Sequence, residues 1–477
     1  MYYSRANAPF CTLPGLERRV YYVLNISEEN VQKRLRHIAP AQIVLGSFVL
    51  LILAGALLLM LPISSQSRQF TPFIDALFTA TSATCVTGLV VVDTATYWSV
   101  FGQAVILLLI QIGGMGVVTM AVIVSLLSGR RIGFRQRYVM QESISAPQVG
   151  GIVRLTGFIL RFTLTMELIS AVLLAIRFIP EFGPLKGAWY GLFHSVSAFC
   201  NAGFDLMGVR APFSSLVAYT GDWLVNLVIM VLIVSGGIGF FAWSDILHNK
   251  FHFHAYRLQT KLVLVTTGLL LVLPALYLFL YEFNQTAWQD LTLGERVWAA
   301  LFQSVTPRTA GFNTVDLTLL HPVTIMMMIF LMLTGGSPGS TAGGFKTTSL
   351  AIVFLTVRAV YAKRDGVNTF GRRIPQDVLR SAVAIIVMYI MLFVAGSVAI
   401  TLIEGLPLSM VLFECASAIG TVGLTLGCTT SLGPISQIIL ILLMYFGRVG
   451  GLTMIYALVS GHIPAPSQLP QERITIG

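Results

Sequence analysis

Charged side chains are scarce in this sequence. Only 10% of its 477 residues are Asp, Glu, Lys or Arg, whereas 56% are hydrophobic. A soluble domain carries roughly 25% charged residues, so this chain lacks the polar groups that would cover a surface facing water. The composition excludes an ordinary soluble protein and indicates an integral membrane protein.

The sequence also lacks the residue patterns of a metal site or an enzyme. Its five cysteines show no CxxC and no Cys/His ligand spacing, which argues against structural zinc and against a disulfide framework. No HExxH, GxSxG or paired-aspartate arrangement occurs in the apolar runs, which disfavours an intramembrane hydrolase. We therefore expect no enzyme, no catalytic residues and no organic cofactor. There is no Rossmann fingerprint after a strand, so any control by a nucleotide must come from a partner.

Eight apolar runs are present, and each is long enough to cross a bilayer of about 30 Å. They lie at 40–61, 101–127, 155–179, 223–247, 262–281, 322–357, 382–403 and 435–459. The first run follows a polar, basic segment (1–39) and spans 22 residues, which predicts a retained helix and not a cleaved signal.

Basic residues gather in the connections that follow every second run. Of the 30 Lys and Arg residues, 21 lie in 1–39, 128–154, 248–261, 358–380 and the tail after 460. The positive-inside rule places these connections and both termini in the cytoplasm. The net charge of +10 thus reflects orientation in a membrane and contact with anionic lipid headgroups, and we expect no nucleic acid partner.

A short pattern occurs four times, once between the two runs of each successive pair. A Phe opens a stretch of small residues that ends at a glycine: 78–88, 193–203, 302–311 and 413–423. The glycines Gly88, Gly203, Gly311 and Gly423 are 115, 108 and 112 residues apart, so the chain repeats itself about every 110 residues. Phe302 precedes its glycine by nine residues and the other three by ten, so the third helix or its turn must differ by one residue.

All four stretches fall on the side opposite the basic connections, so four units of one orientation can surround one axis. Inverted-repeat carriers have halves of opposite topology, which disfavours a secondary cation carrier with a midplane site. Non-helical backbone at membrane depth must be buried in protein or line a water-filled cavity, and glycine allows φ above zero. Rings of carbonyl oxygens replace the hydration shell of a monovalent cation.

We therefore predict an ion filter and a corresponding division of the chain. The filter residues are Cys85, Val86, Thr87, Gly88, Cys200, Asn201, Ala202, Gly203, Arg308, Thr309, Ala310, Gly311, Gly420, Thr421, Val422 and Gly423. The expected parts are a cytoplasmic segment (1–39), four repeats (40–127, 128–247, 248–357 and 358–460) and a cytoplasmic tail (461–477).

The sixth apolar run is interrupted by LTGGSPGSTAGGFKTT at 333–348. Five glycines and a proline make a continuous helix there improbable, so we expect a loop inside the membrane. The corresponding runs contain only GGMG (113–116), SGGIG (235–239) and GRVGG (447–451), which predict milder breaks.

Several charged residues lie in or beside these elements. Lys346 and Arg448 stand inside apolar runs, where charge is expensive and usually functional, although Lys346 has the alternative of reaching the cytoplasmic interface. Glu167 and Arg161 form either a buried pair or separate structural contacts. Loop aspartates that follow filter glycines, such as Asp205, either concentrate cations or cap turns, and Asp316 has the same two options.

The stretches CVTGL, CNAGF, RTAGF and GTVGL resemble the four degenerate filter motifs of the Trk/Ktr/HKT superfamily of potassium transporters, and the resemblance runs from residue 40 to the C-terminus. Eight spans are most like the ion-translocating membrane subunit of the bacterial Ktr system. The resemblance implies an all-α membrane protein with eight transmembrane helices, arranged as four parallel helix, re-entrant pore loop and helix repeats around one central ion pathway.

The resemblance also implies substrate, gate and partners. Gly88 at the first filter position implies potassium as the substrate, with sodium dependence or sodium permeation as an alternative. The loop acts as the gate and Arg448 holds it shut. The gate residues are Gly335, Gly336, Ser337, Gly339, Gly343, Gly344, Lys346 and Arg448. A homodimer in the bacterial plasma membrane, on a cytoplasmic ring of RCK-type (KtrA-like) nucleotide-binding subunits, is the implied assembly.

Overall fold

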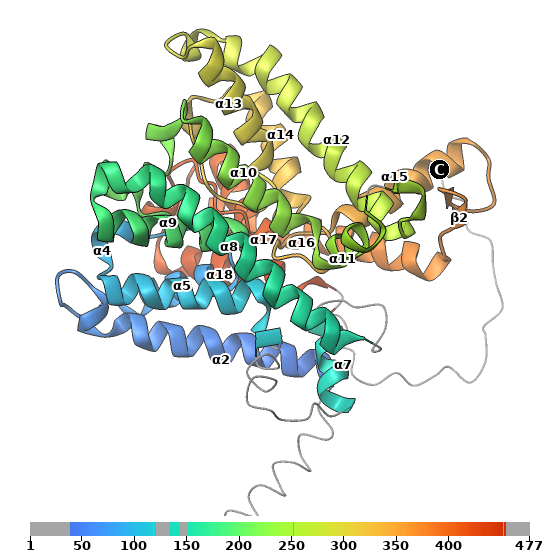
Figure 1. Ribbon diagram of the computed structural model, residues 1–477, viewed down its shortest axis with the longest axis horizontal. Coiled ribbons are helices and arrows are strands. Elements are labelled where there is room, and N and C mark those ends of the chain that lie inside the picture. The colour runs from blue at the N-terminus through green and yellow to red at the C-terminus, as the bar shows by residue number, and fades with distance from the viewer. Residues whose placement is uncertain are drawn as a thin grey trace, which may run out of the picture.

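Helices make up nearly all the regular structure of the computed structural model, which describes residues 39–117, 119–120, 134–143, 151–250, 252–451 and 453–454 (Figure 1). The α-helices are α2 (Pro40–Met60), α3 (Phe73–Thr84), α4 (Thr94–Tyr97), α5 (Val100–Met115), α7 (Phe134–Ser143), α8 (Ile152–Phe182), α9 (Pro184–Phe199), α10 (Trp223–Ile238), α11 (Phe240–Asn249), α12 (Leu258–Leu280), α13 (Leu293–Val305), α14 (Pro322–Leu333), α15 (Thr347–Tyr361), α16 (Gln376–Glu404), α17 (Leu408–Gly420) and α18 (Pro434–Val449).

Short 3-10 turns and one small hairpin complete the described residues. The turns are η1 (Pro62–Ser64), η2 (Met207–Val209), η3 (Val217–Tyr219), η4 (Phe253–Ala255), η5 (Glu282–Asn284), η6 (Thr286–Trp288), η7 (Leu317–Leu319) and η8 (Thr429–Ser431). The strands β1 (Asn368–Thr369) and β2 (Arg372–Arg373) pair antiparallel between α15 and α16. This hairpin is the one departure from the all-α prediction within the described chain, and it does not contribute to the core.

The odd-numbered apolar runs form long helices. Four described helices, α2, α8, α12 and α16, are long and apolar enough to cross a membrane, or five if α10 and α11 count as one bent span. Pro40 stands in the first turn of α2, where its missing N–H is not needed. Gly183 with φ 84° and Gly405 with φ 66° end α8 and α16, because only glycine adopts such angles without a Cβ clash.

The even-numbered runs are not continuous helices, and their glycine breaks are sharper than predicted. α5, α10 and α18 end before Gly116, Gly239 and Gly450, whose φ values are 86°, 96° and 89°. After Gly239 the chain resumes as α11 at an angle of 96° to α10. A positive φ turns the backbone out of the helix, which explains why each run stops there. The remainders of the runs 101–127 and 435–459 lie largely outside the described residues.

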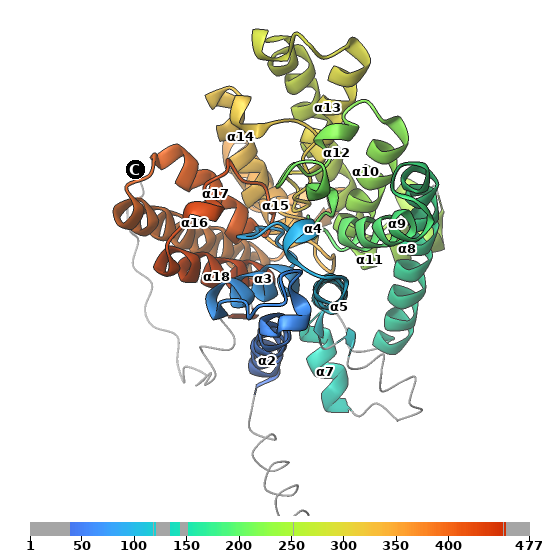
Figure 2. The ribbon, with the colours of Figure 1, turned by 90° about the vertical axis from the view of Figure 1, so that its left-hand side faces the viewer.

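Four groups of helices surround a common centre in Figure 2: α2, α3 and α5 in blue, α8 to α11 in green, α12 to α14 in yellow, and α16 to α18 in orange to red. Within each group the short helix α3, α9, α13 or α17 packs along the long helix that precedes it. Between groups the broken helix packs against the next short helix, as in the pairs α5 with α9, α10 with α13, α14 with α17 and α18 with α3. The contacts therefore run once around the centre and close on themselves.

Candidate functional site

The four filter glycines meet at the centre of the bundle. A Cβ atom on Gly88 would lie 2.5 Å from the carbonyl oxygen of Ala202, and one on Gly203 would lie 2.8 Å from that of Ala310. Each glycine faces the carbonyl oxygen of the residue that precedes the next glycine, and the fourth faces the first unit. The four pairs are Gly88 with Ala202, Gly203 with Ala310, Gly311 with Val422, and Gly423 with Thr87. No side chain fits at these positions, so the segments approach each other by backbone alone.

Each segment contains a second residue with positive φ, which the sequence did not reveal. The glycines have φ values of 94°, 71°, 82° and 97° in chain order. Two residues before them, Val86, Asn201, Thr309 and Thr421 have φ values of 57°, 60°, 64° and 50°. A positive φ at a β-branched residue is a genuine outlier that only surrounding structure maintains. Three of these four residues are β-branched, so the same departure from ordinary backbone geometry recurs at one position of each segment.

A buried hydroxyl behind each segment holds this backbone in place. The hydroxyl residue lies four positions after the opening Phe, and its carbonyl accepts a hydrogen bond of 2.7 to 3.0 Å from the N–H of the residue before the glycine. In the first and fourth units the hydroxyl also accepts from the glycine N–H, at 3.1 and 3.0 Å. In the second and third units it donates to the carbonyl after the glycine. These residues are Ser82, Ser197, Thr306 and Ser417.

The hydrogen bonds of the third unit show where it is one residue shorter than the other units. Its closing hydrogen bond joins the N–H of Ala310 to the carbonyl of Thr306, four residues earlier, at 3.0 Å. In the first unit the corresponding bond joins Thr87 to Ser82, five residues earlier, at 2.8 Å. The expectation of a one-residue difference is confirmed: the closing turn is one residue shorter, and α13 ends three residues after Phe302, whereas α3 ends six residues after Phe78.

A cavity of about 150 Å³ opens on one side of the glycine ring, and we call it the vestibule. Its lining includes Asp93, Asp205, Asn313 and Thr425. Asp205 also accepts a hydrogen bond from the N–H of Met207 at 2.9 Å. Burial in this loop and the neighbouring carboxylate of Asp93 raise the pKa of Asp205 to about 7.

Both aspartates singled out in the sequence therefore cap turns. Asp316 accepts from the N–H of Thr318 at 2.9 Å and does not line the vestibule. Asp93, which the sequence did not single out, does line it and accepts from the N–H of Phe213 at 2.9 Å. Its signal in the sequence was its place five residues after Gly88, the same spacing as that of Asp316 after Gly311.

The loop between α14 and α15, residues 334–346, lies on the other side of the ring and contacts the residues that precede the glycines. The hydroxyl of Thr341 donates to the Asn201 side-chain oxygen at 3.0 Å and to the Phe199 carbonyl at 3.1 Å. A Cβ on Gly343 would overlap the side chain of Thr421. The loop lines a second cavity of about 150 Å³, together with Arg448. The loop, through Thr341 and Gly343, is thus directly against the second and fourth filter segments.

Three cations surround this loop without an acidic partner among the described residues. Arg448 donates to the carbonyl of Thr341 in the loop, and to those of Gly113 and Gly114, the latter at 2.9 Å. The Lys346 ammonium donates to the carbonyls of Ala342 and Gly343 at 2.8 and 3.4 Å, so it folds onto its own loop and does not reach away from it.

The guanidinium of Arg308 points away from the ring, although its backbone belongs to the third filter segment. It donates to the carbonyl of Thr267 in α12 at 3.4 Å and to that of Gly335 at 3.5 Å. Arg308 therefore joins a filter segment to the start of the loop.

The option of a buried pair between Glu167 and Arg161 is wrong: Arg161 is exposed, and Glu167 is buried and bonds to the Gln111 amide at 3.2 Å.

An apolar helical bundle whose broken backbone meets on one axis has the architecture of a membrane transport protein. Comparison with known proteins supports this class. The model of the TrkH family, described as a cation transport protein, matches residues 21–464. The chain therefore belongs to the TrkH family of cation transport proteins, as the filter motifs suggested, and it is a transporter and not an enzyme.

Its relatives align over nearly their whole length. The potassium/sodium uptake protein NtpJ of Enterococcus hirae is 38% identical over 460 residues, which cover 95% of this chain and all of that protein. The Ktr system potassium uptake protein B of Bacillus subtilis is 40% identical over 435 residues, covering 91% and 96%. The crystal structure of the potassium transporter TrkH from Vibrio parahaemolyticus matches with a TM-score of 0.67 at 21% identity, covering 89% of this chain and 84% of that one. This last likeness establishes the fold.

Proposed function

We propose that this protein is the membrane subunit of a Ktr-type potassium uptake system, with a filter made of four backbone segments. The closed ring in which each filter glycine meets the carbonyl of the next unit carries the proposal. Carbonyl oxygens on one axis replace the hydration shell of potassium. The names of the relatives, a Ktr system potassium uptake protein and a potassium/sodium uptake protein, support potassium as the substrate and leave sodium as a second ion or a coupling ion.

Transport begins in the vestibule, which we place on the outer side of the membrane because the basic connections favour a cytoplasmic position for the opposite side. Asp93 and Asp205 attract cations toward the ring. The ion then passes the carbonyls of Thr87, Ala202 and their counterparts and reaches the second cavity when the loop moves. The membrane potential drives this passage with about 2.3 kcal/mol per charge per 100 mV.

The loop 334–346 is the gate in this proposal. It fills the space under Asn201 and Thr421, and Arg448 binds it through the carbonyl of Thr341 while its other contacts reach the first unit. The Arg448 guanidinium thus connects the gate to the glycine break at the end of α5 through hydrogen bonds. Positive charge from Arg448 and Lys346 beneath a cation filter also raises the barrier when the loop is in place.

The assembly and topology complete the proposal. The Ktr system relatives support a separate partner subunit, and we assign to this chain a homodimer bound to a cytoplasmic RCK-type ring in a bacterial plasma membrane. We also assign eight membrane spans to this chain, in four repeats of the same orientation with both termini in the cytoplasm. The glycine breaks in the even-numbered runs fit this repeat.

Flux into vesicles tests the function. Purified protein in liposomes, with an imposed inside-negative potential, should accumulate potassium and rubidium faster than sodium. Uptake of each ion should follow the imposed potential even when no gradient of a second ion is present. A coupled carrier would require such a gradient, so this result distinguishes a channel-like path from a coupled carrier. Equal fluxes of the three ions, or no potential dependence, would refute the filter.

A further inference from the structure

The loop that follows the second filter glycine is the longest of the four. Residues 204–222, 19 in number, separate Gly203 from α10, compared with 11 residues (89–99), 10 residues (312–321) and 10 residues (424–433) in the other units. Leu206, Met207, Leu216 and Tyr219 of this loop are buried, so its two ends are packed against the protein, whereas residues 209–213 between them are exposed. We call residues 204–222 the outer brace.

The inner edge of the outer brace is bonded to the neighbouring units at the vestibule. The N–H of Leu216 donates to the Asn313 carbonyl at 2.9 Å, and the N–H of Asn313 donates to the Ser215 hydroxyl at 3.2 Å. The Thr220 hydroxyl donates to the carbonyl of Thr314. Asn313 and Thr314 come two and three residues after Gly311, so the brace holds the backbone on which the third filter segment ends.

The brace also reaches the first unit. The N–H of Phe213 donates to the Asp93 carboxylate at 2.9 Å, and Gly208 packs so closely against this carboxylate that a Cβ would overlap it. Phe213 and Ser215 line the vestibule beside Asp93. The brace therefore fixes one of the two vestibule carboxylates and part of the vestibule wall.

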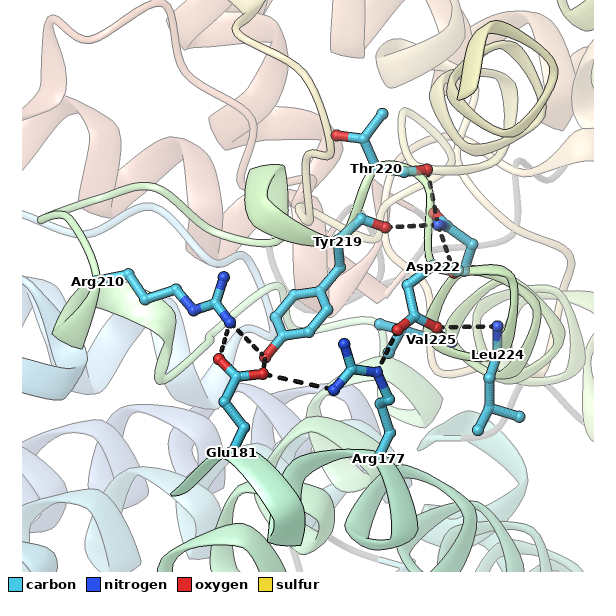
Figure 3. A network of polar contacts seen from close by, with 9 residues as sticks. Arg177, Glu181, Arg210, Tyr219, Thr220, Asp222, Leu224 and Val225 are labelled. Carbon is cyan, nitrogen blue, oxygen red and sulfur yellow. Dashed lines mark hydrogen bonds and ion pairs between the residues drawn. The ribbon is translucent and has the colours of Figure 1, made fainter. Parts of the chain in front are cut away.

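The outer edge of the brace is bound to the end of α8 by a charged network (Figure 3). Glu181 pairs with Arg210 and, at 3.5 Å, with Arg177, and it accepts from the Tyr219 hydroxyl at 2.9 Å. Arg177 also pairs with Asp222 at 2.5 Å. The Tyr219 ring lies between the two guanidinium groups, 4.8 Å from that of Arg210 and 5.5 Å from that of Arg177. Networks of several charges contribute more than isolated surface pairs, and here two acids and two arginines balance.

We propose that this network positions the outer brace, and through it the exit of the third filter segment and the Asp93 carboxylate, so that Glu181 and Arg210 determine how well the mouth accepts potassium. Neither residue touches the ion. They act through the brace, from the outer end of α8, as positioning residues for cation entry and selection. The inference rests on the proposed function, since it assigns these side chains a role in the same filter.

The test compares variants in liposome uptake of rubidium, with sodium as competitor. Glu181→Gln should raise the KM for rubidium by about threefold to tenfold and lower the preference over sodium, while the maximal rate changes little, because the gate is untouched. Tyr219→Phe removes only the hydroxyl, which donates to Glu181 and accepts from Arg210, and should give a smaller shift in the same direction. Glu404→Gln is the matched control: this carboxylate also ends a long helix and bonds to Gly433 and Ser436, neither of which lines the vestibule, so the KM of this variant should stay at the wild-type value.

The double variant Glu181→Gln with Arg210→Gln separates position from charge. It restores the net charge of the network but not the pairing, so the raised KM and weakened selectivity should persist. A return to wild-type values in the double variant, or unchanged KM in Glu181→Gln with a folded protein, would overturn the inference. These outcomes differ from a failure of the proposed function, in which the wild-type protein itself does not select rubidium over sodium.

Discussion

Replacing Gly88 by Ser tests the carbonyl ring at the contact between the first and second units. The added Cβ would lie 2.5 Å from the Ala202 oxygen and 3.1 Å from the Gly203 Cα. Both obstacles are backbone atoms, which cannot rotate away as a side chain does. The second filter segment must therefore move, and in the filter that we propose this movement displaces the carbonyls that bind potassium.

The expected loss of selectivity depends on two energies, the backbone strain at residue 88 and the close contact with Ala202. The φ of Gly88 is 94°, and an L-residue in the left-handed region costs roughly 1–2 kcal/mol. The contact with Ala202 adds to this cost, because real Cβ atoms essentially never come closer than 3 Å to other heavy atoms. If an energy of about 1–2 kcal/mol is lost from the potassium-binding arrangement, the preference for potassium over sodium falls by a factor of about 5–30.

The assay is uptake of radioactive rubidium into liposomes with sodium as competitor, and its control is Gly268→Ser. Gly268 lies in α12 and has no atom within 4 Å of an added Cβ, so the same substitution there should leave selectivity unchanged. Unchanged selectivity in Gly88→Ser, with normal protein yield, would remove the first segment from the filter. A loss of selectivity in Gly268→Ser would show that serine substitution acts through stability and not through the ring.

Three further predictions concern the gate and the vestibule. Arg448→Ala removes the contacts with Thr341 and Gly114 and should increase ion leak several-fold in vesicles without nucleotide or partner; an unchanged leak would make Arg448 purely structural. Deleting residues 336–343 should raise flux in the same assay, whereas a folded protein without flux would contradict the gate. Because the pKa of Asp205 is raised to about 7, its carboxyl is neutral below that pH and charged above it, so apparent potassium affinity should rise as external pH increases from 6 to 8. Asp205→Asn should flatten this profile, and a profile that persists in the variant would assign the titration to another group.

Sequence reasoning located the elements and the glycines because these are local properties. Apolar length marked α2, α8, α12 and α16, and the nine-residue spacing from Phe302 to Gly311 marked the shorter third turn. Glycine content also located the breaks, although not their angle. A bend of 96° after Gly239 depends on where the loop 334–346 packs, since the N–H of Phe240 donates to the Gly339 carbonyl at 2.8 Å.

Other features depend on contacts between units, which no local pattern encodes. Val86 and Thr421 are β-branched and read as ordinary extended or helical residues, yet both adopt positive φ. Contacts outside the local sequence accompany these angles: in the first and fourth units the glycine N–H donates to a buried hydroxyl, and each glycine lies against the carbonyl of the next unit. In the same way, the direction of the Arg308 side chain follows from the free carbonyl at Gly335 and not from its place in a filter motif.

The four units are not identical, and their differences lie on two different sides of the glycine ring. The second unit differs on the vestibule side, where its outer loop is the longest and binds its neighbours. The third unit differs on the other side, where it alone among the described parts of the four units has a long loop in its second run, a turn shortened by one residue, and an arginine in its filter segment. Arg308 bonds to Gly335 and so connects these last features within one unit. If the ring is the potassium filter that we propose, its four units must stay alike at the axis, and differences can accumulate only above and below it. Cation entry and gating are then adjustable by separate units without a change in the filter itself.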